Sequence, residues 1–319
     1  MSSMLARVEV IIAADRLTRR YPGVTALDEL TLEVPPGIVG LVGANGAGKS
    51  TLIKILLGLL PATTGGVRVL GLDPAREGGR VRALVGYMPE HDCLPPELSA
   101  TELVVHMARV SGLPATAARE RAADTLRHVG LYEERYRHIG GYSTGMRQRV
   151  KLAQALVHDP RLVLLDEPTN GLDPAGRAEM LALVRRIGVD FGISVLISSH
   201  HLGEIERICT HVVVIDGGRL LRSSSIAGFT ERSQLLAVEV DERADDLAAR
   251  LIAAGIRVRE DGSTLLVDVG DDLTYDAVRD AIADLELGLI RMEQRQAHIE
   301  DVFRAPRPQE REVEHVIAS

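Results

Sequence analysis

The chain has 319 residues, of which 45% are hydrophobic and 3% aromatic, and its formal net charge is −8. This length allows two domains with aliphatic cores, and the negative charge argues against non-specific binding to nucleic acid. No apolar run approaches the roughly 18 residues that span a bilayer, so we expect no transmembrane helix. We expect no signal peptide either, because Glu9 and Asp15 bracket a very short apolar run. The two cysteines, Cys93 and Cys209, match no metal-ligand spacing, and we expect free thiols in a reducing cytoplasm.

Short apolar strands alternate with helices before residue 229, which is typical of a mainly parallel α/β sheet. Residues Val8–Ile12 and Leu30–Val34 are predicted to be strands of a small antiparallel sheet. Residues Ile38–Val42 form the first buried strand of the main sheet, and the apolar segment Thr51–Leu57 is predicted to be a helix.

A P-loop joins this strand to this helix. The segment reads Gly43-Ala44-Asn45-Gly46-Ala47-Gly48-Lys49-Ser50, is followed by Thr51, and matches G-x-x-x-x-G-K-[ST] at every fixed position. Its glycines let successive backbone N–H groups wrap phosphates where a Cβ would block the approach. Lys49 would reach the β- and γ-phosphates, and Ser50 would supply a hydroxyl to Mg²⁺. The sequence therefore predicts a nucleotide site.

The next part of the chain interrupts the sheet. Residues Leu98–Val129 have helical character, so we predict a helical subdomain over about residues 90–158. The apolar segments Arg161–Leu165 and Ile193–Ser198 are predicted to be further sheet strands, buried on both faces.

Two groups of polar residues can face phosphates. Asp166 ends a predicted strand, where it fits the role of holding Mg²⁺ through water, and Glu167 can orient and deprotonate an attacking water. Ser143 lies where an N-cap would, ahead of the helical segment 147–156. Its hydroxyl, the Gly145 N–H and the helix dipole could all face a γ-phosphate.

These motifs occur in one fixed order: the P-loop, Ser143 and Gly145, Asp166 and Glu167, Gly171-Leu172-Asp173, and His200. In this order the chain resembles the ATP-binding subunit of an ABC (ATP-binding cassette) transporter, over about residues 5–229. The resemblance implies a P-loop NTPase of ABC type, with a mainly parallel sheet core, a small antiparallel β subdomain and a helical subdomain. It also implies ATP hydrolysis with ATP and Mg²⁺.

The resemblance assigns further roles. Tyr21 resembles the aromatic residue that stacks on adenine, and His200 resembles the switch histidine that hydrogen-bonds the γ-phosphate. Gly171, Leu172 and Asp173 resemble the D-loop at the dimer interface. The segment Tyr142–Met146 resembles the signature loop, usually Leu-Ser-Gly-Gly-Gln. Ser143 and Gly145 are kept there, while Tyr142, Thr144 and Met146 depart.

Glu90 is the largest departure, because many family members have Gln at this position of the Q-loop. A carboxylate can still ligate Mg²⁺ directly or through water. The resemblance extends here to exporter ATPases of antibiotic-resistance type, in which this Glu recurs. The loop connects the sheet core to the helical subdomain, whose groove receives a helix of the membrane subunit. We therefore interpret Glu90 as both metal-facing and a coupling element.

The pattern changes after residue 229 to the order β-α-β-β-α-β, which predicts a small ferredoxin-like α+β domain over residues 230–304. Its predicted strands are Leu235–Val240, Ile256–Arg259, Thr264–Val269 and Leu289–Gln294, and its predicted helices are Ala244–Ala254 and Tyr275–Leu285. The segment His298–Phe303 resembles the end of this domain in exporter ATPases. Dimer stabilisation or regulation is its expected role, and residues 305–319 are predicted to be a disordered tail.

The family mechanism implies partners. Two lobes pair head to tail, so that each ATP lies between one chain's P-loop and the other's Ser143 and Gly145. The resemblance therefore implies that the chain forms a homodimer. It also implies that the dimer binds a membrane permease on the cytoplasmic face of the membrane. The ATPase of an importer fits the cassette equally well, although Glu90, the altered signature and the tail favour export. A soluble ABC ATPase of DNA repair or ribosomes is less favoured, because only about 90 residues separate P-loop and signature and no second P-loop exists.

Overall fold

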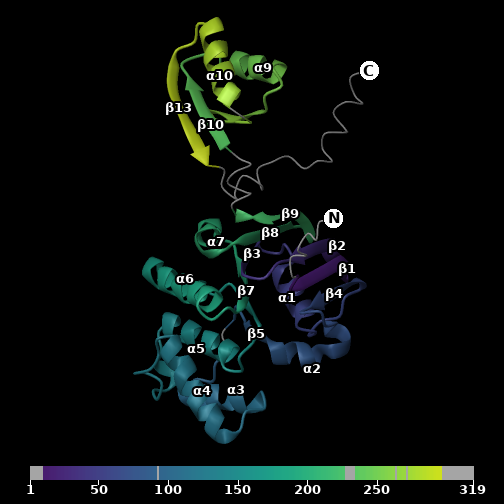
Figure 1. Ribbon diagram of the computed structural model, residues 1–319, viewed down its shortest axis with the longest axis vertical. Coiled ribbons are helices and arrows are strands. Elements are labelled where there is room, and N and C mark those ends of the chain that lie inside the picture. Colours follow the sequence, from purple (N-terminus) through teal and green to yellow (C-terminus); the bar gives the residue numbers. More distant parts are fainter. Residues whose placement is uncertain (1–9, 92, 227–233, 263, 271, 297–319) are drawn as a thin grey trace, which may run out of the picture. The chain divides into compact units, whose positions relative to one another are not determined.

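The computed structural model describes residues 10–91, 93–226, 234–262, 264–270 and 272–296 (Figure 1). The chain divides into two compact units, residues 1–224 and 225–319, and each is described by itself. No helix in these described ranges is long and apolar enough to cross a membrane.

The first unit is built on a six-stranded sheet of order β5-β6-β7-β3-β8-β9. The strands are β3 Ile38–Val42, β5 Val85–Met88, β6 Leu162–Asp166, β7 Ser194–Ser199, β8 His211–Asp216 and β9 Arg219–Ser225. The five strands from β5 to β8 in this order pair in parallel. Every residue of β3, β6 and β7 is buried, as expected of a sheet covered on both faces. The predicted parallel core is confirmed, and the carboxyl ends of β3, β6 and β7 meet at one edge.

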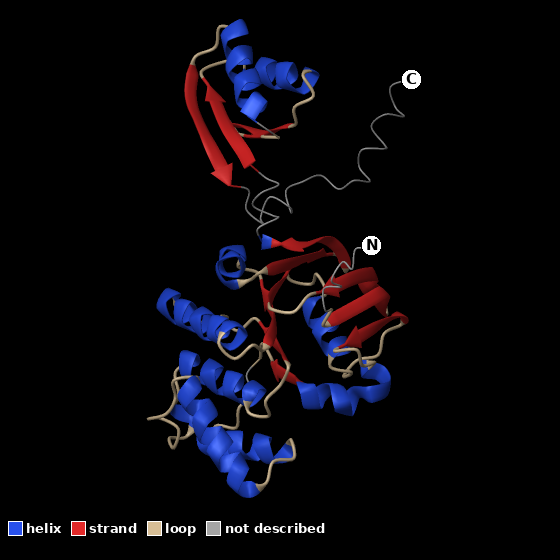
Figure 2. Cartoon of the chain, viewed as in Figure 1, coloured by secondary structure: helices blue, strands red, loops and turns tan. Residues whose placement is uncertain are grey.

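A separate antiparallel sheet has the order β2-β1-β4, with β1 Ile12–Tyr21, β2 Val24–Val34 and β4 Thr64–Val69 (Figure 2). The predicted strand Val8–Ile12 is misplaced, since β1 begins where that prediction ends; Val8 and Glu9 lie outside the described residues. The strand was not predicted beyond Ile12 because charged residues interrupt the apolar alternation there. Its pairing register shifts between Ala14 and Leu17, and Arg16 there has φ 42°. A bulge of this kind breaks the alternation from which strands are predicted.

The helices of the first unit include those predicted after the P-loop and after Ser143. They are α1 Lys49–Leu56, α2 Pro74–Leu84, α3 Ala100–Val110, α4 Ala115–His128, α5 Thr144–Leu156, α6 Pro174–Val189 and α7 Leu202–Ile208, with a 3₁₀ turn at Ile139–Gly141. Helix α3 begins with a capping box between Ser99 and Glu102. It ends at Val110, and Gly112, with φ 98°, lies between its C-cap and α4, which begins at Ala115. Helices α3, α4 and α5 pack together as a helical layer (Figure 1).

The second unit has the order β10 Gln234–Val240, α9 Ala244–Ala253, β11 Val258–Asp261, β12 Thr264–Asp268, α10 Asp272–Asp284 and β13 Leu289–Gln296. Its sheet order is β11-β12-β10-β13, and each neighbouring pair is antiparallel. Strand β12 therefore lies between the two strands that α9 connects, which is a split β-α-β arrangement. The ferredoxin-like prediction is confirmed. The segment His298–Phe303 and the tail lie outside the described residues.

Candidate functional site

The P-loop leaves β3 and enters α1 as a tight cradle. Gly48 is the N-cap of α1 with φ 105°, and a Cβ there would lie 2.5 Å from the Ala26 carbonyl oxygen. Only glycine fits this close approach. Lys49 folds back over the loop, and its Nζ donates to the Gly43 carbonyl oxygen at 2.7 Å. The ammonium is thus buried within the cradle, where phosphate oxygens would be its natural partners.

Glu167 lies directly beyond this cradle, between the side chains of Lys49 and His200. Its Oε1 lies 3.6 Å from Lys49 Nζ, and its Oε2 lies 2.9 Å from His200 Nδ1. The carboxylate is only 7% exposed, whereas the His200 side chain is 41% exposed. The backbone of Glu167 has φ 51°, a left-handed conformation that costs a non-glycine residue about 1 kcal/mol or more. The structure therefore holds this carboxylate in one place at an energetic cost.

Asp166 and Glu167 are held by a hydroxyl that the sequence analysis missed. Ser198 Oγ donates to Asp166 Oδ1 at 2.7 Å and accepts from the Glu167 N–H at 2.9 Å. Ser198 is completely buried in β7, next to β6. Its signal in the sequence is a hydroxyl two residues before His200, directly after the apolar residues Val195–Ile197. Ser50 Oγ lies 3.4 Å from the same Asp166 Oδ1, which brings the P-loop hydroxyl to this carboxylate.

Glu90 reaches the site from the loop after β5. The Asn170 amide donates to Glu90 Oε1 at 3.3 Å, and Asn170 is a second residue that the sequence analysis did not single out. Both line an open hollow of about 530 Å³ together with Glu167, His200 and the P-loop. The other lining residues are Ala26, Ala44, Asn45, Gly46, Ala47, Gly48, Lys49, Ser50 and Thr51.

The donors around this hollow fit Mg²⁺. Ser50, Asp166 and Glu90 offer oxygen atoms, the ligands that this hard cation prefers. The described residues contain no cluster of three or more His, Cys, Asp or Glu able to hold a metal alone. Mg²⁺ commonly takes one or two carboxylates and completes its shell with phosphate oxygens and water. A site with so few protein ligands suits a metal ion that binds together with a nucleotide.

Tyr87 lies in β5 behind this site. Burial raises the pKa of its phenol to about 12, and the negative charge of Asp166 adds to the effect. The phenol therefore stays protonated throughout the physiological pH range.

Tyr21 lies apart from the residues that line the hollow. It ends β1 and is 40% exposed, with the Arg19 guanidinium carbon 4.6 Å from its ring centroid. Arginine on one face leaves the other face of the ring for a stacked base. Ala26, five residues further on, does line the hollow.

The signature residues line a second open hollow, of about 610 Å³. Ser143 is the N-cap of α5, and its Oγ accepts from the Met146 N–H at 3.3 Å. The residues shared by this hollow and the predictions are Ser143, Gly145, Gly171, Leu172 and Asp173. None of the residues that line it also lines the P-loop hollow. One chain therefore brings its P-loop, Glu90, Glu167 and His200 together, and keeps its signature loop elsewhere.

One departure in the signature loop, Tyr142, has a structural explanation. The Tyr142 hydroxyl donates to the Glu134 carbonyl oxygen at 2.6 Å, and burial raises the pKa of this phenol. Arg147 donates to the Tyr142 carbonyl oxygen at 2.7 Å, which ties the loop to the first turn of α5. Tyr142 anchors the loop from behind, while the hydroxyl of Ser143 stays at the helix start.

The D-loop runs into α6. Asp173 is the N-cap of this helix, and its Oδ1 accepts from the Gly176 N–H at 2.8 Å. Arg177 donates to the Leu172 carbonyl oxygen at 3.0 Å. Gly171 has φ 76°, so a glycine is favoured at this turn.

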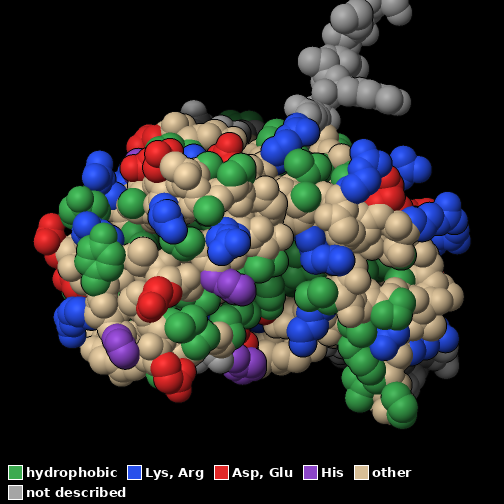
Figure 3. Space-filling view, turned by 90° about the horizontal axis from the view of Figure 1, so that it is seen from below, with side chains coloured by type: hydrophobic (Ala, Val, Ile, Leu, Met, Phe, Trp, Pro, Cys, Tyr) green, Lys and Arg blue, Asp and Glu red, His purple; other side chains and the backbone are tan. Residues whose placement is uncertain are grey.

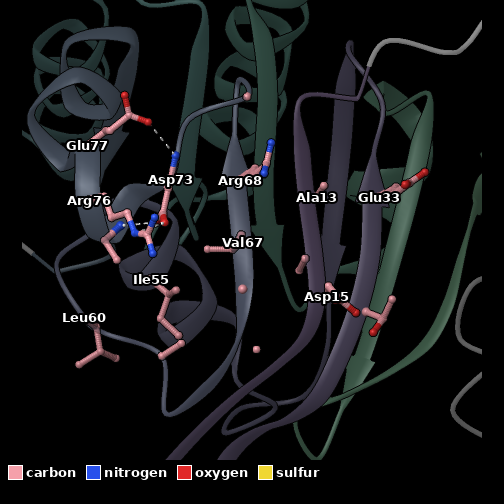
Figure 4. A pocket seen from close by; sticks show the side chains of 17 residues that line it. Ala13, Asp15, Glu33, Ile55, Leu60, Val67, Arg68, Asp73, Arg76 and Glu77 are labelled. Carbon is pink, nitrogen blue, oxygen red and sulfur yellow. Dashed lines mark hydrogen bonds and ion pairs between the residues drawn. The ribbon is translucent and has the colours of Figure 1, made fainter.

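A hollow of about 970 Å³, larger than either of these two, lies elsewhere in the first unit, between the antiparallel sheet and helices α1 and α2 (Figure 4). Its charged side chains partly pair with one another: Arg76 lies 3.5 Å from Asp73, and the backbone N–H of Asp73 donates to Glu77 at 3.4 Å. It contains no P-loop residue. Size alone does not identify the site in this protein.

Comparisons with known proteins agree with this geometry. Residues 27–170 match the family model described as ABC transporter. The chain is 35% identical over 280 residues to the daunorubicin/doxorubicin resistance ATP-binding protein DrrA of Streptomyces peucetius, covering 86% of this chain and 84% of that protein. It is 37% identical over 215 residues to the bacitracin transport ATP-binding protein BcrA of Bacillus licheniformis, covering 67% and 69%. A solved ATP-binding subunit of an ABC transporter superposes with a TM-score of 0.62 at 29% identity, over 69% of this chain and 92% of that one.

Proposed function

Because this chain belongs to the ABC transporter family and is an ABC ATPase, we propose that it powers an exporter of drug-like compounds as one half of a head-to-tail dimer. The fold and the ATP-binding function follow from family membership. We further propose which residues act in catalysis, that Mg²⁺ takes part, and which partners and transported compound the subunit serves.

The contacts of Glu167 support its role as the base in hydrolysis. Lys49 and His200 both contact its carboxylate. A γ-phosphate in the cradle would attract the same two side chains, because charge-assisted contacts to phosphate are strong. Their transfer to the phosphate would leave the carboxylate to accept a proton from an attacking water. Mg²⁺, held by Ser50 and Asp166, would neutralise charge on the phosphates.

The separation of the two hollows is the observation that supports dimerisation. The P-loop hollow contains the acid, the histidine and the cradle, but none of the signature residues. The start of α5 offers a hydroxyl and a helix dipole that suit an anion. A two-fold dimer that sets each signature loop against the other chain's P-loop would complete two equivalent sites.

The relatives support export and a membrane partner. The names of two of them refer to daunorubicin/doxorubicin resistance and to bacitracin transport. We propose a related role here, on the cytoplasmic face of the membrane beside a permease subunit. The helical layer and the loop that follows α4 carry exposed apolar side chains, including Val110 and Tyr136, 70% and 68% exposed. Figure 3 views the molecule from the side of this layer and shows hydrophobic side chains among charged ones. This mixed surface suits contact with another protein.

The proposal is tested by expressing the chain together with a candidate permease subunit from the same genome. Cells with the wild-type pair should accumulate less daunorubicin than cells with E167Q and the same permease, and the two proteins should co-purify. A wild-type pair that raises accumulation in an ATP-dependent manner would indicate import. A purified chain that neither binds nor hydrolyses ATP would contradict the proposal at its base.

A further inference from the structure

A buried lysine of α5 holds the loop that carries Glu90. Lys151 Nζ donates to three successive backbone carbonyl oxygens, those of Pro89, Glu90 and His91, at 2.9, 3.0 and 3.5 Å. Lys151 is only 3% exposed. An ammonium has three donors and no acceptor, and a buried charge is costly unless its donors are satisfied. The lysine therefore restrains the backbone on both sides of Glu90.

A second chain of contacts runs from the same helix to the Glu90 carboxylate. Gln148 Nε2 donates to the Asn170 carbonyl oxygen at 3.1 Å, and the Asn170 side chain donates to Glu90 Oε1 at 3.3 Å. Gln148 and Lys151 are three residues apart, so both lie on one face of α5. Both are buried. Helix α5 thus contacts the backbone of the Glu90 loop directly and its carboxylate through Asn170.

The same helix begins at the signature loop. Ser143 and Lys151 are eight positions apart, about 12 Å along a helix with a rise of about 1.5 Å per residue. In the proposed dimer, Ser143 faces the ATP held by the partner, whereas Glu90 faces the ATP held by its own chain. One rigid element therefore touches both nucleotide sites.

We infer that Lys151 is a positioning residue that sets Glu90 in its own nucleotide site and joins that site, through α5, to the site across the dimer. This inference rests on the proposed function. It predicts that loss of the Lys151 ammonium weakens two measurable properties: the gain in nucleotide affinity that Mg²⁺ gives, and the ATP-driven formation of dimers. Binding of nucleotide without Mg²⁺ depends on the P-loop and should not change.

The experiment uses full-length protein carrying E167Q, so that nucleotide is not consumed. Affinity for a fluorescent ATP analogue is measured with and without Mg²⁺, and dimers are measured by size-exclusion chromatography with light scattering. K151M should reduce the Mg²⁺-dependent gain about tenfold, as expected for a lost contact to a charged group. K151R, which keeps a cationic donor, should retain most of the gain. Q154M alters a polar residue of the same helix and serves as the matched control, with wild-type values expected.

A double-mutant cycle separates positioning from a general effect on folding. If Lys151 acts through Glu90, then K151M added to E90A, which removes the metal-facing oxygen atoms, should lower the Mg²⁺-dependent gain no further than E90A does alone. Additive losses would overturn the inference. N170A leaves the buried lysine in place and removes the contact to the carboxylate, so it should also reduce the gain. An unchanged gain in N170A would overturn the inference even if K151M did not fold.

The outcomes also separate this inference from the proposed function. An E167Q protein that does not bind the analogue contradicts the proposed function and, with it, the inference. An E167Q protein that binds Mg²⁺ and analogue and forms dimers, with K151M indistinguishable from it, overturns the role of Lys151 alone.

Discussion

His200 Nδ1 lies 2.9 Å from Oε2 of Glu167, although the two residues stand on different strand ends and 33 positions apart. The pair exists because β6 and β7 are adjacent and parallel, so their carboxyl ends meet. With Lys49 on the other carboxylate oxygen, Glu167 is held from two sides.

The substitution E167Q should reduce ATP hydrolysis by about 10²- to 10⁴-fold, because an amide cannot accept the proton of the attacking water. ATP binding should persist, since the cradle is unchanged. Phosphate release and equilibrium binding measure the two effects. Hydrolysis near the wild-type rate would show that another group is the base.

The substitution S198A should both destabilise the protein and slow hydrolysis. It removes the donor to Asp166 and the acceptor of the Glu167 N–H from a fully buried position. The free energy of unfolding should fall by about 1–3 kcal/mol, measured by urea denaturation. S111A, at an exposed helix end, should change it by less than about 0.5 kcal/mol. Equal effects of the two substitutions would contradict the role given to Ser198.

Composite sites predict complementation between two inactive proteins. K49A lacks the P-loop cation, S143A lacks the signature hydroxyl, and each homodimer should hydrolyse ATP slowly. A mixed dimer contains one intact site, formed by the P-loop of the S143A chain and the signature loop of the K49A chain. Random mixing in equal amounts should restore about a quarter of the wild-type activity. A mixture no more active than its components would contradict the head-to-tail arrangement.

Stability should fall on acidification, in part through His158. Burial lowers the pKa of this imidazole below its usual value, and its Nε2 is buried without a hydrogen-bond partner. Because the folded pKa lies below the unfolded one, the unfolded chain binds more protons as the pH falls through about 6.5, and stability is lost there. H158Q should reduce the fall in unfolding free energy between about pH 7.5 and 5.5. An identical pH dependence in H158Q would exclude this cause.

The two thiols should differ in reactivity. Burial raises the pKa of Cys209 to about 12, whereas Cys93 is exposed. Thiolate is the reactive form, so Cys93 should react first with an aromatic disulfide reagent in the native protein. The C93S variant should release almost no thiol until it is denatured, and C209S should react like the wild type. Rapid labelling of C93S without denaturant would contradict this assignment.

The parts of the site that obey a local rule could be predicted from sequence. The P-loop needs small residues at fixed spacing, and Asp166 and Glu167 follow an apolar strand, so each is visible in a short window. Ser198 and Asn170 could not be found in this way. Their roles depend on which strand lies beside β6 and which loop lies beside Glu90, and these are long-range relationships. The start of β1 was misplaced for a local reason, the bulge at Arg16 that breaks the alternation.

The separation of the two hollows makes specific activity depend on protein concentration. Under the proposed arrangement, a solitary chain can bind ATP but cannot surround it. Specific activity should therefore rise with protein concentration at high dilution and level off once pairing is complete. If the subunit is bound to a membrane partner, the density of subunits on the membrane, and not their concentration in solution, would determine how often two cassettes pair. The permease would then act as a scaffold that raises the local density of cassettes, in addition to providing the path for the transported compound.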